Sequence, residues 1–194
     1  MVTEGTVTRP TLWGISHLGE IVFYLLAAVT IVVFAYGVYQ NFVRYTSGQE
    51  DWFDRLDALP SRIVTAARIV LSNRKLFDRD TRGGLMHAFI MWGFLTLLIG
   101  TTILAIDMDI YRNVTGMLGT EQSFFVGDFY LAYSLVMDAM GLLFVVGVGV
   151  ALYRRYAVRK ARLWGKHTSL EDDFFIWALF LLGVGGYVAE GVRI

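Results

Sequence analysis

The sequence contains no cysteine and only two prolines in 194 residues, and its 17 basic residues balance its 17 acidic ones, so the formal net charge is zero. Without cysteine, the chain itself forms no disulfide and offers no thiolate for zinc, for an iron–sulfur cluster or for covalent haem attachment. A neutral chain has no bulk electrostatic attraction for nucleic acid, so no nucleic-acid partner is expected. Phosphate-binding loops, nucleophile triads and zinc motifs are missing as well, which excludes the enzyme classes built on them.

Apolar residues dominate what is present. They make up 56% of the chain, and the mean hydropathy is +0.54. Such values are too high for an ordinary soluble domain, and about 20 successive apolar residues are enough to cross a membrane as a helix. Four stretches meet that test, at about 18–43, 84–106, 126–153 and 173–192. The sequence therefore predicts an all-α integral membrane protein, in which residues 1–194 form one bundle of four transmembrane helices surrounded by lipid.

Basic residues predict the orientation of these spans. The connection 44–83 holds eight lysines and arginines and the connection 154–172 holds six, whereas the N-terminal segment and the connection between the second and third spans hold one each. Because cytoplasmic connections are enriched in lysine and arginine, both basic connections are expected in the cytoplasm. The prediction is thus a multi-pass protein of a prokaryotic inner membrane, with both termini outside.

The first basic connection has a pattern of its own. After Pro60-Ser61, apolar residues alternate with Arg62, Arg68 and Arg74. The pattern suits an amphipathic helix on the inner leaflet. A basic loop that only sets the topology explains it equally well.

One histidine, His87, lies inside the otherwise uncharged second span. An imidazole in hydrocarbon is costly unless something binds it, and neutral imidazole is a common axial ligand of haem iron. Arg79 and Arg82 lie where haem propionates would emerge, and Gly93 would let a helix or a flat macrocycle approach closely. The competing interpretation is a histidine that hydrogen-bonds to another helix.

A low-spin b haem usually needs a second axial ligand, and the chain has two other histidines, His17 and His167. His17 precedes the first span and is expected on the opposite side of the membrane from His87. His167 is expected on the same side as His87, in a polar segment, and is the weaker candidate metal ligand of this chain.

Two carboxylates are candidates for proton transfer. Asp138 lies near the middle of the third span, where an acidic residue is a functional candidate by default. Glu190 lies near the outer end of the fourth span. Both are candidate catalytic residues, although a carboxyl group that binds a neighbouring helix, or one that is simply solvated, fits the same positions.

The stretch from Gly84 to Phe94, followed by Ile99–Thr102, resembles the second helix of cytochrome b domains related to the gamma subunit of respiratory nitrate reductase. It is similar in particular to the form fused to a heterodisulfide-reductase-like iron–sulfur module, which includes electron-transfer-flavoprotein:menaquinone oxidoreductases. Glu20–Tyr24 and Gly186–Ile194 resemble the first helix and the end of the fourth helix of that family.

The resemblance implies that His87 is an axial ligand of a b haem near the cytoplasm. It implies no second, outer haem, because Leu97 occupies the position of the ligand for that haem. It also implies menaquinone or another quinone as substrate, and a cytoplasmic iron–sulfur protein or fused iron–sulfur domain as partner, with electron-transfer flavoprotein as a further one. The family has a fifth helix that carries the opposing histidine, and this helix is expected from a missing segment or another chain.

The function predicted from the sequence is a haem-containing membrane subunit or domain of a quinone oxidoreductase. Two alternatives belong to other classes. A haem-free membrane anchor for a redox complex would tolerate His87→Leu, and a small transporter would depend on Asp138 for coupling.

Overall fold

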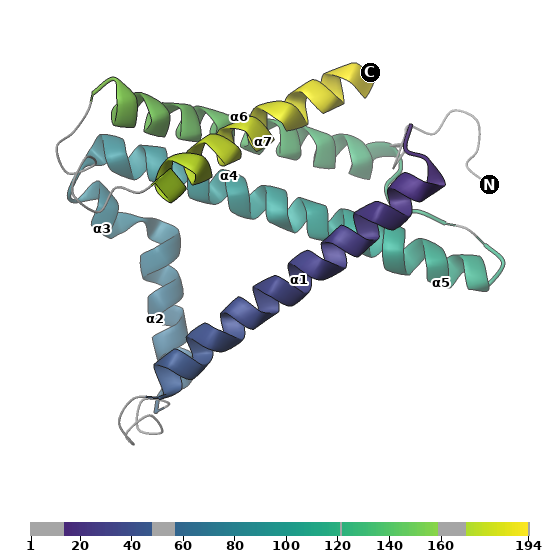
Figure 1. Ribbon diagram of the computed structural model, residues 1–194, viewed down its shortest axis with the longest axis horizontal. Helices are drawn as coiled ribbons and strands as arrows, with labels where there is room; N and C mark the ends of the chain where they lie inside the picture. The colour runs from purple at the N-terminus through teal and green to yellow at the C-terminus, as the bar shows by residue number, and fades with distance from the viewer. Residues whose placement is uncertain (1–13, 48–56, 121, 159–169, 194) are drawn as a thin grey trace. The chain divides into compact units, whose positions relative to one another are not determined.

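The computed structural model describes residues 14–47, 57–120, 122–158 and 170–193, and these residues form helices joined by short turns (Figure 1). The elements are α1 (His17–Thr46), α2 (Leu59–Ser72), α3 (Arg74–Phe77), α4 (Thr81–Ala105), the π-helical turn η3 (Ile106–Tyr111), α5 (Arg112–Met117), α6 (Gly127–Tyr156) and α7 (Leu170–Arg193). Four helical stretches are long and apolar enough to cross a membrane, which confirms the predicted all-α fold class with four apolar helices.

The four apolar helices overlap the four apolar stretches of the sequence, and each ends beyond the corresponding stretch. The second stretch is the longest, because α4, η3 and α5 continue one another from Thr81 to Met117 over 37 residues. At 1.5 Å per residue this stretch is about 55 Å long, well beyond a hydrocarbon core of about 30 Å. The basic connection after α1 contains a true helix, α2, so the helical interpretation of that segment is confirmed among the described residues.

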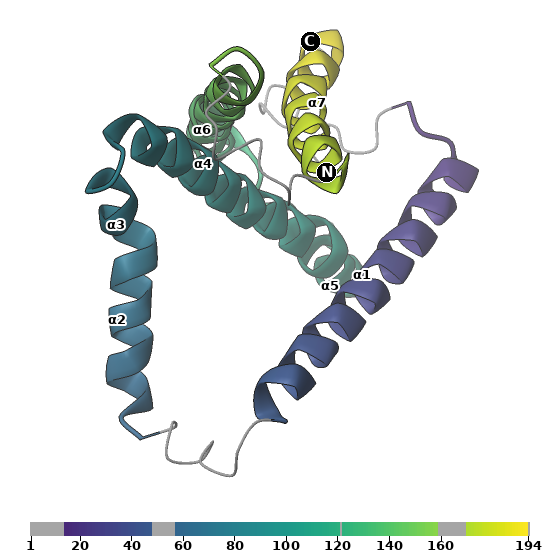
Figure 2. The same cartoon turned by 60° about the vertical axis from the view of Figure 1, so that its left-hand side comes forward.

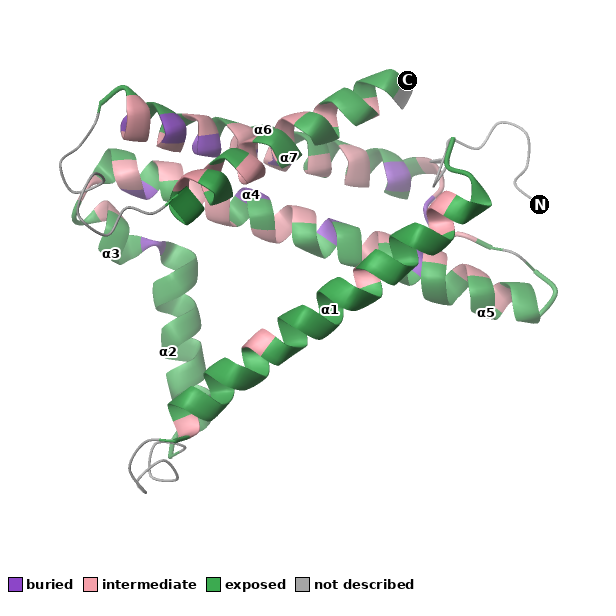
Figure 3. Cartoon of the chain, viewed as in Figure 1, coloured by how far each residue is buried: buried purple, intermediate pink, exposed green. Residues whose placement is uncertain are grey.

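The chain divides into two compact units, and the division falls within α2 after Arg68. The unit that precedes it contains α1, which begins at an N-cap where Ser16 Oγ accepts a hydrogen bond from the Gly19 amide at 3.3 Å. No residue of α1 is buried, and Figure 3 shows it exposed along almost its whole length. A helix that is apolar all round and uncovered by protein is suited to lipid contact.

The other unit is built around the antiparallel pair α4 and α6, with α7 packed on α6 and the short α3 packed on the start of α4 (Figures 1 and 2). Its buried apolar side chains come mostly from α6 and from the turn before it, and include Phe125, Phe144 and Val148, which are 1%, 5% and 0% exposed. Figure 3 shows buried segments, in purple, on both α4 and α6.

Glycine allows α4 and α6 to approach closely. A Cβ on Gly93 would lie 2.7 Å from the Phe144 Cβ and 2.8 Å from the Met140 carbonyl oxygen, so only a residue without a side chain fits there. Membrane helices lack a hydrophobic drive to associate and depend on such close backbone contact. The pairing of α4 with α6 sets the positions of the polar side chains at both ends of this unit.

Candidate functional site

His87 lies in the second turn of α4 and is held by a residue from the preceding turn. Its Nδ1 is 2.9 Å from the Oδ1 of Asn73, which joins α2 to α3. Asn73 is 3% exposed and has a positive φ of 51°. Its Nδ2 donates to the Met91 sulfur at 3.7 Å. The residue is exposed overall, and Asn73 contacts its Nδ1 and not its Nε2.

A cavity of about 320 Å³ opens beside His87. Its wall combines the α3–α4 turn, the first turns of α4, the end of α6 and Ile176 of α7. Three arginines line it, namely Arg79, Arg154 and Arg155. The cavity thus places one imidazole beside three guanidinium groups at one end of an apolar helix pair, a combination suited to a flat apolar ligand that carries carboxylates.

Two ion pairs tie the helices together around this cavity. Arg154 is 8% exposed and donates to Asp80 at 2.5 Å. Asp80 is also the N-cap of α4, because its other oxygen accepts from the Gly83 amide at 3.0 Å. Arg155 donates to Asp173 of α7 at 2.6 Å, and Tyr156 donates to the same oxygen at 2.8 Å. Two of the three arginines are therefore paired with carboxylates from other elements, and these pairs hold the wall of the cavity in place.

A second cavity of about 220 Å³ lies further along the same helices, between α4, α6 and α7. Asp138 and Glu190 both line it, together with the hydroxyl-bearing Tyr133, Ser134 and Tyr187. The Tyr187 hydroxyl donates to the backbone carbonyl of Asp138 and so joins α7 to α6. Two acids and three hydroxyls in an otherwise apolar wall can bind a polar headgroup and exchange protons with it.

Most of the predicted site residues fall at these two cavities. His87 and Arg79 meet at the first, and Asp138 and Glu190, 52 positions apart in the sequence, meet at the second. Arg82 is exposed and is not among the residues that line the first cavity. Gly93 lies in the α4–α6 contact, and His167 lies outside the described residues.

Three residues that matter here were missed by sequence reasoning. Asn73 lies 14 positions before His87, beyond a left-handed turn, and Arg154 lies 74 positions after Asp80, so no helical spacing reveals these contacts. One signal was available. Asp80 followed by Gly83 and an apolar run is typical of a helix N-cap, and it would have placed the start of α4.

A buried carboxylate lies at the other end of this unit, where α4 continues into η3. Asp107 is 0% exposed in the π-helical turn η3. It accepts from Arg112 at 2.9 Å, from the Ser123 hydroxyl at 2.8 Å and from the Phe124 amide at 3.0 Å. These contacts tie the end of α4 to the loop that leads into α6, and satisfy a carboxylate that would otherwise be costly to bury.

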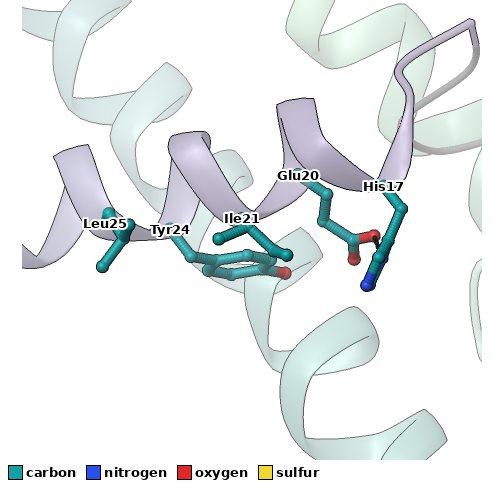
Figure 4. Close-up of a pocket in the computed structure, with 5 residues that line it drawn as sticks. All are labelled: His17, Glu20, Ile21, Tyr24 and Leu25. Atoms are coloured by element: carbon teal, nitrogen blue, oxygen red, sulfur yellow. Dashed lines mark ion pairs between the residues drawn. The ribbon is translucent and has the colours of Figure 1, made fainter.

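His17, the remaining histidine of the described residues, lies on α1. Figure 4 shows it beside Glu20, and the two side chains form a pair at 3.6 Å above a shallow hollow that Ile21, Tyr24 and Leu25 complete. Every residue of that hollow belongs to one helix, and His17 is 86% exposed. Within the described part of the chain, no group of three or more histidine, aspartate or glutamate side chains is arranged to hold a metal ion.

The fold and the two cavities define a multi-pass helical membrane protein with a histidine site and an acidic site along one helix pair. Comparison with known proteins narrows the class. The chain is 29% identical over 175 residues to an EtfAB:quinone oxidoreductase of Syntrophomonas wolfei, a match that covers 90% of this chain and 22% of that protein.

Two other kinds of relative match with similar identity. One is a subunit of the dihydromethanophenazine:CoB–CoM heterodisulfide reductase of Methanosarcina barkeri, which is 25% identical over 194 residues, with 87% of this chain and 70% of the relative covered. The other is the probable iron–sulfur-binding oxidoreductase FadF of Bacillus subtilis, which is 26% identical over 150 residues, with 77% of this chain and 20% of FadF covered.

The chain is therefore distantly related to membrane subunits of quinone and heterodisulfide oxidoreductases, and it spans about a fifth of the length of the Syntrophomonas and Bacillus relatives. No protein-family model matches the chain, and no solved structure matches it. The wider relation to the gamma subunit of nitrate reductase stays a prediction from the sequence motifs.

Proposed function

We propose that this chain is the haem-bearing membrane part of a quinone oxidoreductase, and that it passes electrons between an iron–sulfur or flavoprotein partner in the cytoplasm and the quinone pool. The observation that carries the proposal is the setting of His87. Its imidazole is held at Nδ1 by a buried amide, the residue is exposed overall, and it borders a cavity that three arginines also line. A histidine that served only to join two helices would need no such cavity beside it.

The residues present fit a b haem. His87 would bind the haem iron through Nε2, and Arg79, Arg154 and Arg155 would donate hydrogen bonds to the propionates. When bound, the haem would supply a one-electron redox centre at this end of the membrane. A second histidine to hold the haem would come from His167 or from a further helix of the assembly.

The second cavity supports the quinone end of the proposal. Asp138 and Glu190 would bind the quinone headgroup and exchange protons with it, while Ser134 and Tyr187 supply hydrogen-bonding hydroxyls. His87 and Leu97, which lines this cavity, are ten residues apart on α4, or about 15 Å along the helix. Electron transfer at His87 and proton transfer at Asp138 and Glu190 would therefore take place at two different depths along the same helix pair.

The proposed partners are supported by the names of the relatives, which are an EtfAB:quinone oxidoreductase, a heterodisulfide reductase component and a probable iron–sulfur-binding oxidoreductase. Because this chain has no cysteine, an iron–sulfur cluster would be carried by another domain or another polypeptide. That partner would dock where Arg79 and the end of α6 lie, which is the basic, cytoplasmic end in the proposed orientation.

A reduced-minus-oxidised optical spectrum tests this proposal. The detergent-purified chain is measured alone and with the neighbouring segment or partner, using first dithionite and then a soluble quinol as reductant. A low-spin b-type signal that the quinol also produces supports the proposal, and a requirement for the partner assigns the second ligand to it. If no haem signal develops under either condition, the cytochrome proposal is wrong and a haem-free anchor explains the chain better.

A further inference from the structure

Asn73 has a backbone conformation that few residues adopt. Its φ of 51° places it in the left-handed region, where asparagine is tolerated far better than most residues with a side chain. The left-handed turn ends α2, since the Asn73 amide donates to Val70 at 3.2 Å, and begins α3, since its carbonyl accepts from Leu76 and Phe77 at 2.9 and 3.1 Å. As a result, the side chain of a residue 14 positions earlier in the sequence reaches His87.

The two ends of the Asn73 amide have different neighbours. Nδ2, a donor, faces the sulfur of Met91, which can only accept. Oδ1, an acceptor, faces Nδ1 of His87 at 2.9 Å. Met91 is one helical turn beyond His87 on α4, so both residues that contact the Asn73 amide lie on the same face of that helix. The contact with Met91 determines which end of the amide points toward His87. An acceptor oxygen at this position requires a proton on Nδ1.

A neutral imidazole carries one proton, so the proton held at Nδ1 leaves the lone pair on Nε2. We propose that Asn73 is a positioning residue that selects this tautomer of His87 and makes Nε2 the nitrogen that faces the cavity as a metal ligand. Histidine ligands in metal sites commonly donate their second N–H to a carboxylate or carbonyl oxygen, which fixes the ring and raises its basicity. Here the amide oxygen of Asn73 has that role.

A purely structural role makes a different prediction. If Asn73 only joined the α2–α3 turn to α4, its loss would lower thermal stability but would leave the tautomer of His87 and the properties of a bound haem unchanged. The tautomer is a property of the chain itself, whereas the ligand role of Nε2 rests on the proposed function. The two parts therefore need separate measurements.

The first measurement is nitrogen-15 NMR of the whole chain, labelled at histidine and purified in detergent without haem. His17→Gln and His167→Gln backgrounds identify the His87 signals. In the chain with Asn73 intact, the expected spectrum shows Nδ1 protonated and Nε2 unprotonated at neutral pH. Asn73→Gly, which keeps the left-handed turn available while removing the amide, is expected to give a mixture of tautomers. Asn73→Asp, which keeps an acceptor oxygen, is expected to retain the Nδ1 proton.

Met91→Leu is a matched control for the orientation of the amide. It removes the sulfur acceptor and conserves volume, so the tautomer should become less uniform while the fold remains intact by circular dichroism. A proton on Nε2 in the intact chain would overturn the inference. So would identical His87 signals in the intact chain and in Asn73→Gly.

The second measurement uses the haem-loaded assembly. Loss of an outer hydrogen-bonding partner typically costs 10- to 100-fold in metal affinity, so Asn73→Gly should lose haem about 10- to 100-fold more readily than the intact chain. Asn73→Asp should retain haem and lower its reduction potential, because a carboxylate gives the imidazole more negative character. Equal haem retention and equal potentials in all three proteins would contradict a positioning role.

These outcomes separate the inference from the proposed function. A chain that shows the expected tautomer but never binds haem would refute the proposed function and leave the tautomer selection by Asn73 standing. A chain that binds haem with a tautomer independent of Asn73 would refute the inference alone.

Discussion

Replacing Asp80 should reveal how strongly the wall of the His87 cavity is held. Asp80 makes two contacts through different oxygens: a cap on α4 through Gly83, and an ion pair with Arg154. Asp80→Asn keeps an acceptor for the cap but removes the charge. Asp80→Ala removes both contacts. The difference between the two variants therefore isolates the cap.

The magnitude follows from burial. Breaking a fully buried ion pair costs about 3–5 kcal/mol, because the remaining charge is left uncompensated. Here the Arg154 side chain is 10% exposed and the Asp80 side chain 23% exposed, which places the pair below that range. We expect Asp80→Asn to lower the free energy of unfolding by about 2–3 kcal/mol, and Asp80→Ala to lower it by about 1 kcal/mol more because the cap is lost.

The assay is denaturant-induced unfolding in detergent micelles, followed by circular dichroism. Asp57→Asn is the matched control, because the Asp57–Arg62 pair is 68% and 56% exposed and should contribute little. A double-mutant cycle of Asp80→Asn with Arg154→Met should give a coupling of about 1–3 kcal/mol. A coupling near zero, or an Asp80→Asn variant as stable as the Asp57→Asn control, would refute the role assigned to this pair.

Three further changes test other parts of the structure. Gly93→Ala should destabilise the chain by about 1–3 kcal/mol because its Cβ would lie 2.7 Å from the neighbouring helix, whereas Gly185→Ala, with open space around it, should have little effect on the same unfolding curve. Asp138→Asn and Glu190→Gln should each slow quinol oxidation about 100-fold and leave the haem spectrum unchanged, and a normal rate in both would remove these acids from proton transfer. Asp107→Ala leaves the half-buried donors of Arg112 and Ser123 without their acceptor and should cost about 2–3 kcal/mol; an unchanged unfolding midpoint would contradict the role assigned to that carboxylate.

Much of the fold was predictable because it depends on composition over whole segments. The four apolar stretches and the absence of strand signals correspond to the four apolar helices of the structure. The residues at which the helices begin and end were harder to predict from the sequence. The second stretch continues past its predicted end into η3 and α5, where Asp107 binds Arg112 on the same stretch and also Ser123 and Phe124 in the loop before α6.

The sequence identified individual residues of the candidate site but not the contacts between them. His87 stood out because an imidazole in an apolar span is conspicuous, and Asp138 stood out for the same reason. Their surroundings depend on tertiary contacts. Asn73 reaches His87 through a left-handed turn, and Arg154 reaches Asp80 across 74 positions in the sequence. Neither contact has a local pattern that reveals it.

Gly93 shows why the role of a small residue cannot be assigned from the sequence. A glycine in a membrane helix permits the close approach of either another helix or a cofactor. The structure places it against the backbone of α6, where the space is filled by Phe144 and Met140. Packing of two particular helices decides between these alternatives, and a single sequence does not record which helices pair.

The most direct test of the central claim is the haem content of His87→Leu compared with His17→Leu, each produced in the complete assembly and measured by its reduced-minus-oxidised spectrum. His17 is the matched control, because it is exposed on α1 and lies outside the cavity beside His87. The account predicts that His17→Leu keeps the b-type signal of the unmodified protein and that His87→Leu loses it while remaining folded in the membrane. An undiminished signal in His87→Leu would show that His87 is not a haem ligand and would contradict the account.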